Sequence, residues 1–110
     1  MKINKFEVES HSLSKILGFY AINNWTTRSS AADNDWHSVC WSPELHLFVA
    51  VATTGTGNRV MTSPDGMNWI TRTSAADNSW YSVCWSPELS LFVAVAATGT
   101  GSRVMTSPMG

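Results

Sequence analysis

The side chains best suited to recognising a ligand are an acid, an amide and an indole that recur together twice. The first occurrence consists of Asp33, Asn34 and Trp36, and the second consists of Asp77, Asn78 and Trp80. A carboxylate and an amide suit sugar hydroxyls, and an aromatic face suits a sugar ring, so a glycan site is one interpretation. The other is that the acid and the amide hold a loop by bonding to its backbone.

No catalytic or metal-binding set is evident elsewhere in the sequence. The histidines at His11, His37 and His46 form no recognised set of metal ligands. Glu44 and Glu88 lie in Ser-Pro-Glu-Leu turns, where we expect both to be solvated rather than paired for hydrolysis. We therefore expect no metal and no cofactor.

The two cysteines, Cys40 and Cys84, each lie in the tetrapeptide Ser-Val-Cys-Trp. Equivalent positions of successive repeats are usually farther apart than the ~4.4–6.8 Å between Cα atoms that a disulfide needs. We expect two reduced thiols, which together with the absence of an apolar leader at the start slightly favours the cytoplasm.

The overall composition excludes several classes of protein. Seven basic and eight acidic residues give a net charge of −1, which does not favour binding to nucleic acid or to an anionic membrane. The longest apolar stretches, 47–52 and 91–96, are far shorter than the ~20 residues of a membrane helix. At 110 residues, the chain fits one small domain.

The chain contains an internal duplication, with equivalent residues 44 positions apart. Residues 25–66 align with residues 69–110, and 34 of the 42 aligned positions are identical. The two units must therefore share a structure and nearly all of their contacts. We divide the chain into residues 1–24, a first repeat at 25–68 and a second repeat at 69–110.

Each repeat has the signals of short antiparallel strands. We expect strands over 36–41, 45–52 and 59–63, then a tight turn at 64–66 and a fourth strand over 69–72. In the expected strand 45–52, side chains that point to either face of the sheet are mostly apolar, which indicates a strand buried on both faces. Four strands in ~40–45 residues make one propeller blade, so the predicted fold class is all-β.

The turn before the fourth strand resembles a known motif. The run Ser63-Pro64-Asp65-Gly66-Met67-Asn68-Trp69 resembles the Asp-box of BNR (sialidase-type) β-propellers, Ser-x-Asp-x-Gly-x-x-Trp, although the acid and the glycine are adjacent here. The resemblance covers about residues 25–110 and implies two propeller blades. We expect structural roles for Ser63, Asp65, Gly66 and Trp69, with the acid accepting backbone N–H bonds and the indole packing between sheets.

The resemblance does not extend to catalysis. A sialidase needs clustered arginines on the bound carboxylate and a tyrosine nucleophile with its acid partner. The repeats carry two arginines each at matching positions, and Tyr81 is replaced by His37 in the other copy. We therefore expect the protein not to be an enzyme.

The second copy of the motif is incomplete, because Met109 stands where the first copy has Asp65. The expected third strand at 103–107 has no fourth strand, whereas 25–28 is a fourth strand without a third. Two blades cannot close a ring, which needs about four. We predict a head-to-tail homo-oligomer, a trimer first and a tetramer next, closed by Trp25, Thr27 and Arg28 of one chain on Arg103, Val104 and Met105 of its neighbour.

Residues 1–24 are either an arm or a degenerate strand, since 15–17 precede Trp25 at the offset by which 59–61 precede Trp69. The predicted function is a self-assembling interaction scaffold whose partner is the chain itself, with a protein ligand as a further possibility. The alternative is a lectin-like propeller whose repeated glycan sites gain by multivalency. Differences such as Asp35 against Ser79 make alternate sites unequal, which favours the scaffold.

Overall fold

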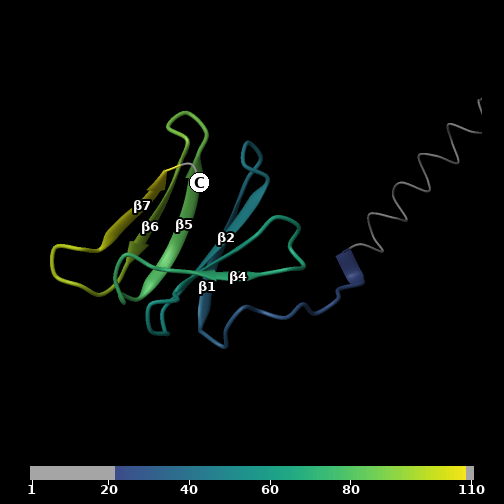
Figure 1. Ribbon diagram of the computed structural model, residues 1–110, viewed down its shortest axis with the longest axis horizontal. Coiled ribbons are helices and arrows are strands. Elements are labelled where there is room, and N and C mark those ends of the chain that lie inside the picture. The colour runs from purple at the N-terminus through teal and green to yellow at the C-terminus, as the bar shows by residue number, and fades with distance from the viewer. Residues whose placement is uncertain (1–21, 109–110) are drawn as a thin grey trace, which may run out of the picture.

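The computed structural model describes residues 22–108, which form two antiparallel sheets (Figure 1). The first sheet has the order β1 (Trp36–Ser42), β2 (Leu47–Ala52), β3 (Val60–Ser63) and β4 (Ile70–Arg72). The second has the order β5 (Trp80–Ser86), β6 (Leu91–Ala96) and β7 (Val104–Pro108). The all-β prediction is confirmed. Most of segment 1–24, and the end of the incomplete second motif, lie outside the described residues.

The described strands lie within one residue of the expected bounds, except at the first hairpin. β2 begins at Leu47 rather than at Leu45, because the chain turns through Leu45 and His46. His46 has a φ of 49°, in the left-handed region that ends strand geometry. Ser90 occupies the same position in the second sheet with a φ of 52°.

The strands of the two sheets pair in the same register within each sheet. Ser38 pairs with Val51 in the first sheet as Ser82 pairs with Val95 in the second, and both first hairpins have an irregularity just before that pair. Such a bulge increases the local twist of a strand, so both sheets are shaped alike.

Each sheet has two faces that the pairing defines. We call "front" the face of the first sheet that carries Val39, Ala50 and Met61, which lie opposite one another on β1, β2 and β3. We call "back" the face that carries Cys40, Val49 and Thr62. The same terms apply to the second sheet, whose front face carries Val83, Ala94 and Met105.

The core forms where the back face of the first sheet meets the front face of the second. Val49 and Val51 from the first sheet pack in one cluster with Val83, Phe92 and Ala94 from the second. β5 lies close to both β1 and β2. Burial of these side chains supplies the main force that holds the two sheets together.

Two apolar surfaces are not covered by another sheet within residues 22–108, although Ala50 and Met61 on the first of them are buried. On the front face of the first sheet, Val39 is 58% exposed and Trp41 is also exposed. On the back face of the second sheet, Val95 and Val104 are exposed. No helix within residues 22–108 is long and apolar enough to cross a membrane.

Candidate functional site

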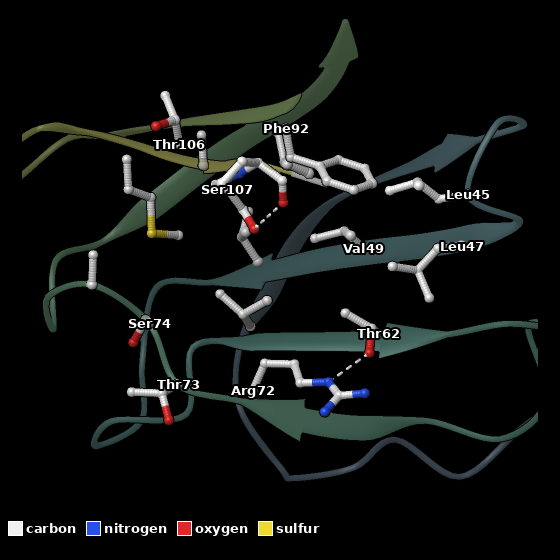
Figure 2. Close-up of a pocket in the computed structure, with 17 residues that line it drawn as sticks. Leu45, Leu47, Val49, Thr62, Arg72, Thr73, Ser74, Phe92, Thr106 and Ser107 are labelled. Carbon is white, nitrogen blue, oxygen red and sulfur yellow. Dashed lines mark hydrogen bonds between the residues drawn. The ribbon is translucent and has the colours of Figure 1, made fainter. Parts of the chain in front are cut away.

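A groove of about 710 Å³ lies between the two sheets (Figure 2). Its walls are mostly apolar and come from the core-facing sides of both sheets, including Leu47, Val49, Thr62, Phe92, Ala94 and Met105. Figure 2 shows Phe92 pointing from the second sheet toward Leu45 and Val49 of the first. On the first-sheet wall, Arg72 Nε donates a hydrogen bond to Thr62 Oγ1 at 3.0 Å.

The edge of the second sheet borders this groove. β7 pairs with β6 on one side, and no strand within residues 22–108 pairs with its other side. Residues Met105 to Pro108 of β7 line the groove. An open strand edge of this kind presents unpaired N–H and C=O groups to any further strand.

The equivalent place in the first sheet is filled by the chain itself. β4 pairs with β3 there, with Thr71 opposite Met61. The Trp69 ring precedes β4 and lies 6.2 Å from the Phe48 ring, centroid to centroid. Trp69 also lines a hollow on the front face together with Ala50 and Met61. An indole therefore packs on the front face of the first sheet, whereas the matching surface of the second sheet is the open groove.

The segment that matches Trp69–Arg72 in the first repeat makes no strand in this chain. Trp25 is 84% exposed, and Thr27 and Arg28 are exposed as well. The Trp25 indole donates a hydrogen bond to the carbonyl of Ile22, as Trp69 donates to the carbonyl of Gly66 three residues before it. In Figure 1 the segment leaves the sheets on the side opposite β7.

The turn that precedes Trp69 is closed by two side chains. Asp65 Oδ1 accepts hydrogen bonds from the N–H groups of Met67 at 2.8 Å and Asn68 at 2.9 Å. Ser63 Oγ accepts one from the N–H of Gly66 at 2.7 Å. Gly66 itself has a φ of 77°, a conformation that other residues adopt only with strain. These bonds place the Trp69 indole over the front face.

Asp65 makes the stability of the fold depend on pH. Hydrogen bonds from the backbone of Asn68 and Met67 favour the carboxylate and hold the pKa of Asp65 well below its ordinary value. Because the folded pKa is lowered, this stabilisation is complete above the unfolded pKa of about 3.9 and is lost as the pH falls below it. We expect Asp65→Asn to unfold at a lower temperature than the parent at pH 7 and to differ less at pH 2. Equal differences at both pH values, measured by circular dichroism, would contradict this role.

Five of the six residues of the glycan interpretation form hydrogen bonds within the chain, and the sixth, Asp33, is exposed. Asn78 Nδ2 donates to Ser102 O at 2.7 Å, and Asn34 Nδ2 donates to Asn58 O at 3.0 Å. Trp80 is fully buried, and its indole donates to the carbonyl of Ala76. Trp80 therefore has no ring face open to a sugar. Trp36 is partly buried, and its indole donates to the carbonyl of Ala32 in the same way.

Arg59 forms a polar junction between the two repeats that we did not predict from the sequence. Its Nη1 donates to the carbonyl oxygens of Thr53 at 2.7 Å and Asn78 at 2.9 Å. Its backbone N–H donates to Ser74 Oγ, and Asp77 Oδ1 accepts the N–H of Gly57 at 2.8 Å. The sequence feature that could have indicated this junction is the arginine that both repeats carry at the same position, Arg59 and Arg103.

Other bonds join the two sheets directly. Ser38 Oγ accepts the N–H of Val83 at 3.2 Å, and Glu44 Oε1 accepts a bond from the Trp85 indole. The His37 and Tyr81 rings meet edge to face with 4.7 Å between their centroids. Each of these bonds and contacts joins one repeat to the other.

The cysteines differ in their surroundings although their sequences match. Both thiols are free. Cys40 packs against the core between the sheets, and burial, with a smaller effect of Cys84, raises the pKa of its thiol to about 11. Cys84 is exposed.

The geometry defines, over residues 22–108, an all-β chain of two matched sheets with a mostly apolar groove between them. No group of three or more potential metal ligands occurs among residues 22–108. Comparison with protein-family models, with curated proteins and with solved structures gave no match.

Proposed function

We propose that the chain is a non-catalytic, self-assembling β-propeller module that acts as an interaction scaffold. Each four-stranded sheet is one blade, and copies join head to tail into a ring. The observation that carries the proposal concerns the one sheet–sheet interface among residues 22–108, which joins the back face of the first sheet to the front face of the second. The front face of the first sheet and the back face of the second meet no other sheet within these residues.

The match between these faces follows from the sequence identity of the repeats. The back face of the first sheet covers the front face of the second within the chain. The uncovered back face of the second sheet carries the same residue types as the first, with Cys84, Val93 and Thr106 for Cys40, Val49 and Thr62. It can therefore cover the uncovered front face of another copy by the same contacts. Such an interface is heterologous and closes when its rotation divides the circle.

The open edge of β7 supports the same arrangement. The segment Trp25–Arg28 matches Trp69–Arg72 except that Thr26 stands for Ile70, and its indole makes the same local bond. In a second copy, this segment would therefore pair with β7 as β4 pairs with β3. Its indole would then occupy the groove beside Phe92, as Trp69 lies beside Phe48. Strand addition of this kind supplies backbone hydrogen bonds and one aromatic anchor at each junction.

The solution mass tests this proposal directly. We expect a stable species of about 36 kDa, three times the 12.0 kDa of one chain, giving six blades. A tetramer with eight blades would also support the ring. A chain that stays at 12.0 kDa at micromolar concentration, by light scattering or native mass spectrometry, would contradict it.

Thiol labelling provides a second readout on the same sample. In a ring, Cys84 acquires the position that Cys40 has between two sheets, so both thiols react slowly with a maleimide. In a monomer, the exposed Cys84 reacts much faster than Cys40. Biphasic labelling of the undiluted protein, with one fast thiol per chain, would therefore oppose assembly.

A further inference from the structure

We infer that the loop at residues 30–34 of one copy clasps Arg103 of the next, and that this polar clasp fixes the register of assembly. The inference rests on the proposed function and adds to it a second contact, distinct from the groove and the Trp25 segment. It assigns to Asp33 and Asn34 a partner, which is a second copy of this chain.

The template for the clasp is the Arg59 junction within the chain. There the arginine, with 15% of its side chain exposed, donates to the carbonyl of Asn78 and lies 3.9 Å from Asp77. Asp77 accepts the N–H of Gly57, and Ser74 accepts the N–H of Arg59. These donors and acceptors come from the end of the first repeat and the beginning of the second.

Every residue that bonds across this junction between the repeats has an identical counterpart 44 positions away, whereas Thr53, which accepts through its backbone carbonyl within the first repeat, is matched by Ala97. The arginine and the glycine that donate correspond to Arg103 and Gly101 at the end of the second repeat. The acceptors correspond to Ser30, Asp33 and Asn34 at the beginning of the first repeat. Within one chain, these two halves lie at opposite ends of the repeat array and cannot meet as their counterparts do.

The bonds that are present show that each half is already shaped for the contact. Arg103 Nε donates to the carbonyl of Gly99 at 2.6 Å, as Arg59 Nε donates to Gly55 at 2.8 Å. Arg103 is exposed, and among residues 22–108 none accepts a bond from its terminal nitrogens. Asn34 holds its own loop through Asn58, as Asn78 does through Ser102.

The clasp adds specificity to the apolar contacts, because its hydrogen bonds form only in one orientation. Apolar faces tolerate small slips, whereas an arginine that must reach one carbonyl and lie beside one carboxylate permits a single register. The exposed ion pair adds little by itself, so most of the effect comes from bonds to backbone groups.

Charge reversal in the full chain tests the clasp. We expect Arg103→Glu and Asp33→Arg each to raise the concentration for half-assembly at least about tenfold. Both positions are exposed in the single chain, so the unfolding temperature of the dissociated protein should not change. Combining the two substitutions in one chain removes the like-charge repulsion of each single variant but does not restore the bonds to the backbone carbonyl, so the double variant should assemble less weakly than the two separate effects together predict. Sedimentation velocity over a range of concentrations measures all of these values.

The matched control is Arg59→Ala, which breaks the same bonds inside the chain. It should lower the unfolding temperature of the monomer, which Arg103→Ala should leave unchanged. If the parent assembles but the single reversals do not weaken it, or if their effects simply add in the double variant, the clasp is wrong and the ring stands. If the parent is a monomer, both proposals fail.

Discussion

Replacing Trp25 by alanine should abolish assembly while leaving the two-sheet body folded. The ring is 84% exposed in the single chain, so its removal costs the monomer little. In the groove beside Phe92 the same ring would be largely buried, and losing a buried tryptophan costs about 3–5 kcal/mol. Each junction should therefore weaken by about two orders of magnitude or more. Sedimentation velocity at micromolar concentration should show only the 12.0 kDa chain.

The equivalent residue within the chain provides the control. Trp69 lies against Phe48 and donates to the carbonyl of Gly66, so Trp69→Ala should lower the unfolding temperature. The two substitutions remove the same side chain from the same motif, one between chains and the other within a chain. An assembly of unchanged mass for Trp25→Ala would show that the groove binds something else.

Replacing Trp80 by alanine should have the largest effect on folding. Trp80 is fully buried in the cluster between the sheets, and its indole donates to the carbonyl of Ala76 at 3.0 Å. The expected loss of about 3–5 kcal/mol is comparable with the whole stability of a small domain. We expect the variant to be largely unfolded at 25 °C, as judged by far-ultraviolet circular dichroism.

Two further variants separate the packing of Trp80 from its hydrogen bond. Trp80→Phe keeps an aromatic ring but loses the indole donor, and should cost less than the alanine variant. Trp36→Ala removes the matching residue of the first repeat, which is only partly buried, and should destabilise the monomer less. A Trp80→Ala chain as stable as the parent would place this indole outside the core.

The fold could be predicted from the sequence because its strands are marked by local signals. The apolar run before Ala52 and the Pro-Asp-Gly turn each act over a few residues, so neighbouring structure hardly alters them. The predicted start of β2 was wrong by two residues because His46 adopts a left-handed conformation. Neither a histidine there nor the serine at the matching position, Ser90, indicates such a conformation in the sequence.

The site was harder to predict because it depends on position in the array rather than on residue type. Trp36 and Trp80 have nearly identical neighbours in sequence, yet one is partly exposed and the other is fully buried. The difference arises because, among residues 22–108, only the second sheet has its front face covered by another sheet. The Arg59 junction likewise joins loops from two repeats, so no single stretch of sequence contains it.

In a ring built this way, the number of copies is not encoded by any one residue. It follows from the angle at which a back face meets a front face, because every junction repeats that angle. Side chains at the meeting point, such as Ala94 against Val49 and Val51, set how far the sheets splay. A continuous change in packing there would appear as an integer change in stoichiometry.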